Sequence, residues 1–273
     1  MVYQKFEALG RWVWDTIRLS EKLHIRQGEE TITDTILLEI ERQRYPNIRV
    51  IQTPKHLEVE KGTDWEWYVG ANRYGWVRFA IQAKKLKVAS GRYESLSDRA
   101  GTSPTADLQA KVLRDYADAN AGVIPLYSFY NYFPSATQAT HWHCPLTFEQ
   151  RLLGWTVTPL RIVEHALVTH GGKSFDAIHR RTNTLPVRCL FCCPALIMQY
   201  LIPSSTGAVG SFLGEPFQKL ARLPQEIVLA AERGSIETFS LDFYNPEIGI
   251  FPRRIMVVDV SELLPEGLGD PMR

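Results

Sequence analysis

Alternating side chains in two neighbouring segments constrain the fold of this chain more than any other feature. In DWEWYVG, residues 64–70, Trp65 and Trp67 alternate with acidic residues, and in FAIQAK, residues 79–84, Phe79 and Ile81 alternate with small or polar ones. A period of two residues is typical of half-buried strands, because successive side chains point to opposite faces. We therefore predict a β-hairpin with one apolar and one polar face.

The same alternation predicts the register of the hairpin. If the turn is centred on Arg73, Asp64 lies opposite Gln82 and the apolar faces of the two strands coincide. A shift of one residue would place the tryptophans opposite glutamine and lysine, so the pattern favours the first register. Directly opposed Cβ atoms lie about 4.5–5.5 Å apart. Asp64 and Gln82 should therefore be neighbours, with Lys84 two residues further along the same face.

Composition indicates a folded protein without a global preference for polyanions. The chain has 273 residues, of which 45% are hydrophobic, enough for one large domain or for a core with an appended half. Its 31 basic and 30 acidic residues leave a formal net charge of +1, so a polyanion would have to bind a local patch. No apolar run reaches the roughly 18 residues of a membrane span, and the N-terminal segment lacks a signal-peptide pattern. We expect a soluble, cytoplasmic protein with no membrane contact.

The first half of the chain reads as an α/β pattern. Helical periodicity predicts helices over residues 3–24 and from about residue 28 to Pro46, the second capped by Thr31 or Thr33. A strand at 48–53, the hairpin, a helix at 106–122 and a strand at 123–132 follow. Residues 131–145 then separate a predicted core, 1–134, from a mixed α+β half, 135–273, packed on that core. This second half contains a strand-like segment at 253–261, but its architecture does not follow from the pattern.

The polar face of the hairpin suits the chemistry of a hard cation. Mg²⁺ or Mn²⁺ prefers oxygen ligands, so the Asp64 carboxylate and the Gln82 amide oxygen could hold the ion while a phosphate completes its shell. Lys84 could orient a metal-bound water or neutralise charge on the phosphate. The alternative is that these residues are only the solvated face of a sheet, since such spacings are common.

The order of elements adds a family resemblance. A helix, three strands with Asp64 on the second and a Gln82-x-Lys84 motif on the third, and then a helix and a strand resemble the PD-(D/E)XK nuclease superfamily. The segment IQAKKL, with glutamine in place of glutamate, is similar to the variant in Mrr-type restriction endonucleases. GTDWEW, IQAKKL and PLYSFYN also resemble segments of a bacterial domain family of unknown function that is associated with nuclease-like defence proteins. The resemblance covers residues 25–134 and implies a restriction-endonuclease-like core.

This resemblance implies a magnesium-dependent DNA endonuclease in bacterial antiviral defence, with RNA as an alternative substrate. Asp64 and Gln82 take the positions of the metal ligands and Lys84 that of the motif lysine. The superfamily often adds a glutamate from the preceding helix, for which Glu30 is the first candidate. The alternatives are Glu29 and Glu39, and Glu66 is an extra acid that could replace Gln82. A homo-oligomer or a defence-system partner would fit this function. A non-catalytic nucleic-acid-binding or scaffold protein of the same fold is the competing hypothesis.

Basic residues near the motif are candidate phosphate contacts, although each could equally be part of a solvated strand edge. They are Arg73, Arg78, Lys85, Lys87 and Arg92. Gln109, on the helix after the motif, has a counterpart in the superfamily that lines the site, but an exposed helix position is the favoured interpretation.

The four cysteines fall in two segments, which raises the question of a structural zinc ion. Cys189 and Cys192 have C-x₂-C spacing, and Cys144 with His141 or His143 would complete a tetrahedral set. This set would define a zinc-stabilised interaction module. The alternative, buried reduced thiols, is favoured by the apolar sequence around Cys189.

Overall fold

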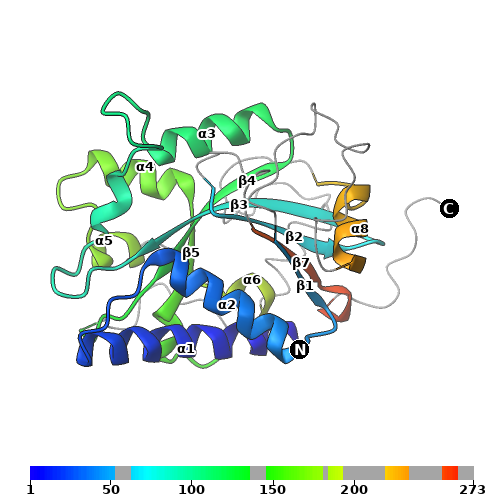
Figure 1. Ribbon diagram of the computed structural model, residues 1–273, viewed down its shortest axis with the longest axis horizontal. Coiled ribbons are helices and arrows are strands. Elements are labelled where there is room, and N and C mark those ends of the chain that lie inside the picture. The colour runs from blue at the N-terminus through cyan, green and yellow to red at the C-terminus, as the bar shows by residue number, and fades with distance from the viewer. Residues whose placement is uncertain (53–62, 136–145, 181–183, 193–218, 234–253, 264–273) are drawn as a thin grey trace.

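A mixed seven-stranded sheet forms the centre of the molecule. The computed structural model describes residues 1–52, 63–135, 146–180, 184–192, 219–233 and 254–263 (Figure 1). In these ranges the strands follow one another across the sheet as β1 (Ile48–Gln52), β7 (Arg254–Asp259), β2 (Trp65–Ala71), β3 (Gly75–Lys85), β4 (Val123–Tyr130), β5 (Trp155–Pro159) and β6 (Leu185–Pro186). Pairs β7–β2 and β3–β4 are parallel, and the other pairs are antiparallel.

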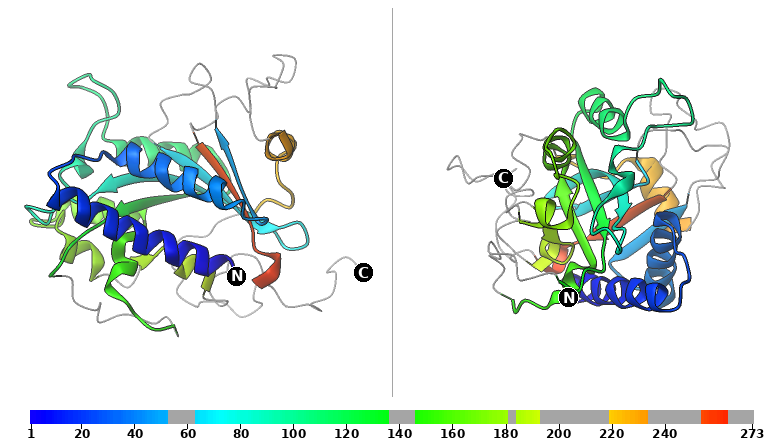
Figure 2. Two further views of the ribbon diagram at one scale, coloured as in Figure 1. Left: turned by 60° about the horizontal axis from the view of Figure 1, so that its bottom comes forward. Right: turned by 90° about the vertical axis from the view of Figure 1, so that its left-hand side faces the viewer.

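Helices cover both faces of this sheet (Figure 2). One face packs against α1 (Val2–Lys22), α2 (Glu29–Gln43) and α6 (Cys189–Cys192). The other packs against α3 (Gln109–Ala119), α4 (Leu160–Val168), α5 (Phe175–His179) and α8 (Gln225–Arg233). Short 3₁₀ turns lie at Glu94–Ser97, Gln150–Gly154 and Ser261–Leu263. The chain is thus α/β, and the predicted order of helix, three strands, helix and strand is confirmed by α2, β1, β2, β3, α3 and β4; the restriction-endonuclease likeness itself stays a prediction.

The hairpin of β2 and β3 has the predicted register. Trp65 pairs with Ile81, and Ala71 pairs with Gly75, which has the positive φ of 88° that a tight turn can require. The apolar face packs under α1, where Trp65 stacks on Trp155 with 5.7 Å between ring centroids. Burial of the tryptophans therefore directs the alternate side chains, including Gln82, to the other face.

Strands from both predicted halves share the sheet. β7 confirms the strand-like segment at 253–261, but it inserts between β1 and β2, so the strands at 48–52 and 65–71 are not neighbours. β5 and β6 extend the opposite edge beyond β4. The predicted division at residues 134 and 135 therefore falls between adjacent strands of one sheet.

The predicted caps of the second helix are wrong. α2 begins at Glu29 after Gly28, and no side chain caps it. Thr33 lies inside the helix, where its hydroxyl donates to the carbonyl of Glu29 and contacts the Tyr130 hydroxyl at 2.8 Å. The earlier start places Glu29 in the first turn, facing the end of β3.

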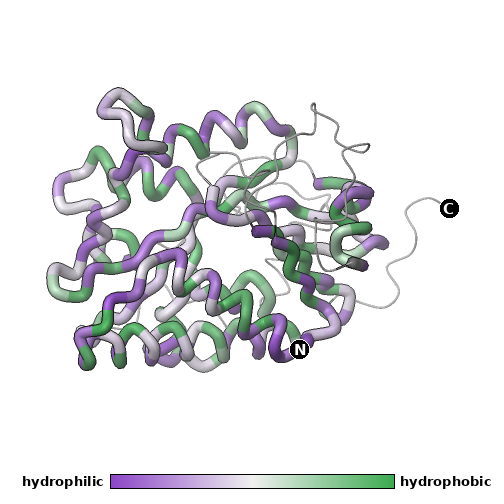
Figure 3. The backbone as a smooth tube through the Cα atoms, viewed as in Figure 1, coloured by the Kyte–Doolittle hydropathy of each residue, from purple (hydrophilic) through white to green (hydrophobic). Residues whose placement is uncertain are grey.

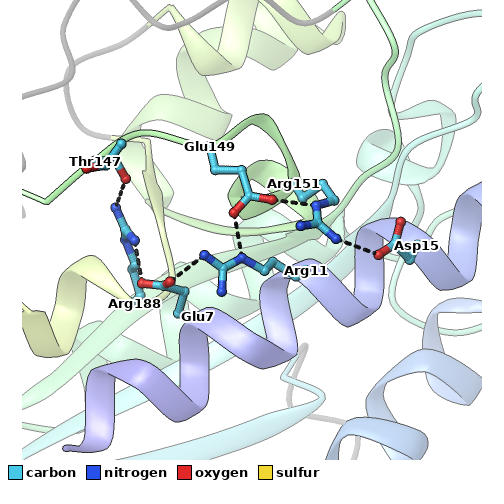
Figure 4. Close-up of polar contacts among 7 residues, drawn as sticks. All are labelled: Glu7, Arg11, Asp15, Thr147, Glu149, Arg151 and Arg188. Atoms are coloured by element: carbon cyan, nitrogen blue, oxygen red, sulfur yellow. Dashed lines mark hydrogen bonds and ion pairs between the residues drawn. The ribbon is translucent and has the colours of Figure 1, made fainter.

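A ladder of ion pairs joins α1 to the second half of the chain (Figure 4). The hydropathy colouring shows polar and apolar residues alternating along α1, as expected for a helix with one buried stripe (Figure 3). On its polar side, Glu7 binds Arg11 at 2.6 Å and accepts a hydrogen bond from Arg188. The ladder continues through Glu149 and Arg151 to Asp15.

The two ends of this ladder should differ in their contribution to stability. Glu7→Ala deprives Arg188, which is only 3% exposed, of its carboxylate, and we expect the free energy of unfolding to fall by about 2–3 kcal/mol. Asp15→Ala breaks an exposed pair with Arg151 and should cost less than about 1 kcal/mol. Urea unfolding of both variants tests this, and equal losses would contradict the assigned role of Arg188.

Candidate functional site

Asp64 and Gln82 are in direct contact, as the register predicted. The Gln82 side-chain amide Nε2 donates to Asp64 Oδ2 at 2.6 Å, and the backbone N–H of Ala83 donates to the same oxygen at 2.7 Å. Asp64 directly precedes β2 and is tied to β3 by its own N–H, which donates to the Ile81 carbonyl at 2.8 Å. The carboxylate is therefore held by backbone as well as by a side chain.

Lys84 joins this pair to the helices on both sides of the sheet. Its ammonium donates to Gln109 Oε1 at 2.7 Å and lies 3.7 Å from Glu29 Oε2, although the side chain is only 2% exposed. Gln109, at the start of α3, is therefore a site residue, and the expectation of a merely exposed position is wrong. A buried ammonium with two partners from different helices is fixed in place.

Glu29, and not Glu30, is the helix glutamate beside the motif. Its Oε1 accepts from the backbone N–H of Lys85 at 2.9 Å and from the Ser95 hydroxyl at 2.7 Å. Glu30, the next residue of the helix, is exposed. Glu39 lies about 15 Å further along the axis, where Arg42 and Gln43 bind it and their hydrogen bonds lower its pKa to about 2.

The Asp64 carboxylate ionises with difficulty. Burial raises its pKa to about 6, and Glu29 adds to the rise, whereas the hydrogen bond from Ala83 and the charge of Lys84 oppose it. Its negative charge is therefore only partly compensated at neutral pH. A divalent cation bound there would relieve this cost.

Glu66 and Arg78 do not belong to the site. Glu66 is completely buried, and both of its oxygens accept hydrogen bonds from Arg78, at 2.9 and 3.0 Å. The hydroxyls of Tyr116 and Tyr68 donate to it as well, at 2.5 and 3.3 Å. With its oxygens occupied in this way, Glu66 has no geometry for holding a metal, and Arg78 serves as its counter-ion and not as a phosphate contact.

Three of the predicted phosphate contacts lie near the end of β3. Lys87 and Arg92 pair across a tight turn, and Lys85 ends the strand. Two of them have acidic partners: Lys85 lies 3.7 Å from Glu21, and Lys87 binds an exposed glutamate, Glu94, at 2.8 Å.

Arg73 lies away from the site. It is exposed in the turn of the hairpin, about 20 Å or more from Asp64 by the rise of the intervening strand. Its grouping with the other basic residues is therefore wrong.

A hollow of about 830 Å³ adjoins the site. It opens between the end of α1, the loop to α2 and the turn after β3, and its walls include Lys85, Lys87 and Ser95. Lys85 and Ser95 also donate hydrogen bonds to Glu29, so two residues of the hollow are in direct contact with the glutamate beside the motif.

The zinc hypothesis stays a prediction. Cys189 is buried and Cys192 is partly buried in α6, but His141 and Cys144 lie outside the described residues. Within the described ranges, no three His, Cys, Asp or Glu side chains gather as they would around a metal ion. The Asp64 site has instead two carboxylates and one amide.

Comparison with known proteins places the chain in a family. The model of a family of unknown function matches residues 3–262. The chain belongs to this family, DUF6615. No curated protein and no solved structure matches the DUF6615 chain. Among its described helices, none combines the length and the apolar character needed to cross a membrane.

Two residues near the candidate site of this DUF6615 chain were not predicted from the motif. Ser95 comes from a 3₁₀ turn, and Tyr127 comes from β4, where it pairs with Gln82. Glu29 did have a signal, since it precedes the buried residues Ile32, Thr33 and Ile36 by three, four and seven positions. Extending this buried stripe by one turn toward the N-terminus of the helix predicts that Glu29 faces the sheet.

Proposed function

We propose that the chain is a metal-dependent nuclease that hydrolyses phosphodiester bonds in DNA. The observation that carries the proposal is the convergence of Asp64, Gln82 and Lys84 with Glu29 at one end of β3. This arrangement has the residue types and order of the D…Q-x-K variant of PD-(D/E)XK nucleases. It also has a partly buried acid, Asp64, whose raised pKa favours cation binding.

The donor set fits Mg²⁺ or Mn²⁺. Among the described residues, Asp64 Oδ1 has no hydrogen-bond partner, so it is available as a ligand. Rotation of the Gln82 amide would turn its oxygen toward the same space, and Glu29 could act directly or through water. A bound ion would supply Lewis acidity and lower the pKa of a water molecule.

The remaining residues suit the binding and polarisation of a phosphate. Lys84, held by Gln109 and Glu29, would neutralise charge that develops on the scissile group. Lys85 and Lys87 line the adjoining hollow, where they could exchange their acidic partners for flanking phosphates. Such exchange would make binding sensitive to salt.

The test is a cleavage assay on plasmid, linear DNA and RNA with Mg²⁺, with Mn²⁺ and with chelator. We expect DNA cleavage that requires the ion and falls at least about 100-fold in Lys84→Met, which keeps the aliphatic stem. Lys22→Met removes the same charge from an exposed position of α1 and should cleave normally. Cleavage that persists in chelator or in Lys84→Met would overturn the site assignment.

A role in bacterial antiviral defence is part of the proposal and is supported by the resemblance alone. Expression of the wild-type chain should then reduce phage plating, and expression of Asp64→Asn should not. Salt-dependent DNA binding without any metal-dependent cleavage would instead favour the competing hypothesis, a non-catalytic nucleic-acid-binding protein of the same fold.

A further inference from the structure

The Tyr127 hydroxyl is an unsatisfied polar group in the core. The side chain is completely buried beneath α3 and α4, and among the described residues its hydroxyl has no hydrogen-bond partner. The neighbouring buried tyrosines differ in this respect: Tyr93 donates to Asn131, and Tyr130 contacts Thr33. An unpaired buried hydroxyl costs about 1–3 kcal/mol, so phenylalanine would pack there at lower cost.

The Tyr127 side chain lies on the same face of the sheet as the candidate metal ligands. Gln82 stands between the other two residues: its side chain contacts Asp64, directly before β2, and it pairs with Tyr127 in the parallel register of β3 and β4. Paired residues on neighbouring strands point to the same face of a sheet. The pKa of Tyr127 is consistent with this position. Burial raises it, and the negative charges of Asp64, Glu164 and Glu29 raise it further. The hydroxyl therefore stays protonated.

Gln82 needs a new partner when its amide turns toward an ion. In the structure, Nε2 faces Asp64 and donates a hydrogen bond to it. To bind an ion held by Asp64, Gln82 would need its oxygen, Oε1, on that side instead. Once Oε1 faces the ion, Nε2 must leave Asp64, and this amide is 4% exposed, so an unpaired N–H would be costly. A tyrosine oxygen with a free lone pair can accept that N–H.

We propose that Tyr127 is a positioning residue that holds the Gln82 amide in its metal-binding orientation by accepting a hydrogen bond from Nε2. The inference rests on the proposed nuclease function and extends it, since it gives a reason why an amide can stand where related enzymes have a carboxylate. Hydrogen-bond partners of metal ligands fix ligand orientation, and their loss typically weakens metal binding about 10–100-fold. A carboxylate at residue 82 would present an oxygen in either orientation and would not need Tyr127.

A double-mutant cycle on Mn²⁺ affinity tests this. In the full chain, Tyr127→Phe should weaken Mn²⁺ binding, measured by calorimetry, about tenfold, but the same change should have less than about a twofold effect in a Gln82→Glu background. In chelator, Tyr127→Phe should melt at the same temperature as the wild type or higher, because an unpaired hydroxyl is removed. Tyr93→Phe is the matched control, which should lose stability and keep its Mn²⁺ affinity.

Several outcomes would overturn the inference while leaving the nuclease proposal intact. They are unchanged Mn²⁺ affinity in Tyr127→Phe, an equal loss in both residue-82 backgrounds, or a lower melting temperature in chelator that reveals a structural partner for the hydroxyl. A wild-type protein that neither binds Mn²⁺ nor cleaves nucleic acid would overturn the proposed function and the inference together.

Discussion

Replacing Asp64 with asparagine is expected to abolish metal-dependent cleavage and to make the protein more stable at neutral pH. Cleavage should fall about 1,000-fold, because the variant loses the carboxylate that would anchor the ion, and such an ion contributes several kcal/mol to catalysis. The fold should tolerate the change. The asparagine oxygen can accept the hydrogen bonds that Gln82 and Ala83 now donate to Oδ2.

The gain in stability follows from the raised pKa of Asp64. The folded state keeps the proton up to about pH 6, whereas an unfolded aspartate loses it near its ordinary value of 3.8. Stability of the wild type should therefore fall as pH rises through this window, and above it the ionised carboxylate costs on the order of 2 kcal/mol, allowing for its partial exposure. Asp64→Asn removes this cost. The two proteins should melt alike near pH 4 and differ by about 5 °C at pH 7.

The control is Asp118→Asn, which removes the same charge from an exposed position of α3. It should cleave normally and show no pH-dependent gain over the wild type. Thermal melts from pH 4 to 8 in chelator decide the stability half of the prediction. A melting difference that is constant across this range would show that Asp64 ionises normally.

Glu66→Ala should be among the most destabilising single substitutions in the chain. It leaves the Arg78 guanidinium without its carboxylate in a largely buried position and removes the acceptor of two tyrosine hydroxyls. Breaking such a pair costs about 3–5 kcal/mol. Urea unfolding measures this loss directly.

A second variant distinguishes a structural role of Glu66 from a role in metal binding. The double substitution Glu66→Met with Arg78→Met removes both charges and fills the space with apolar side chains, so at least half of the lost stability should return. Once folded, this variant should cleave DNA at nearly the wild-type rate. If it is stable but inactive, Glu66 belongs to the metal site after all.

The spacing of apolar residues along single strands and helices was sufficient to predict the central contacts of the candidate site. The register that brings Asp64 to Gln82 follows from burying Trp65 and Trp67 on one face, because a slip of one residue would reverse every side chain. The same register makes Arg78 a diagonal neighbour of Glu66, so their ion pair could have been inferred as well. Glu29 likewise lies on the stripe that the buried isoleucines of α2 define.

Other parts of the site depend on contacts between segments distant in sequence. The alternation in residues 254–259 predicts a strand but not its position between β1 and β2, because any exposed strand edge can accept a partner. Gln109 meets Lys84, and Tyr116 meets Glu66, only because α3 crosses the polar face of the hairpin. Helical periodicity specifies which face of α3 is buried, but not what that face contacts.

The hairpin, its register and the pairing of Asp64 with Gln82 can be predicted from the amino-acid sequence, since they follow from side-chain period and from the burial of one face. The electrostatic state of the site cannot, because it depends on long-range packing. The raised pKa of Asp64, the enclosure of Lys84 between two helices and the unpaired hydroxyl of Tyr127 all depend on which distant atoms exclude water from the end of β3. Burial and the field of neighbouring charges are properties of the packed layers, and no local pattern encodes them.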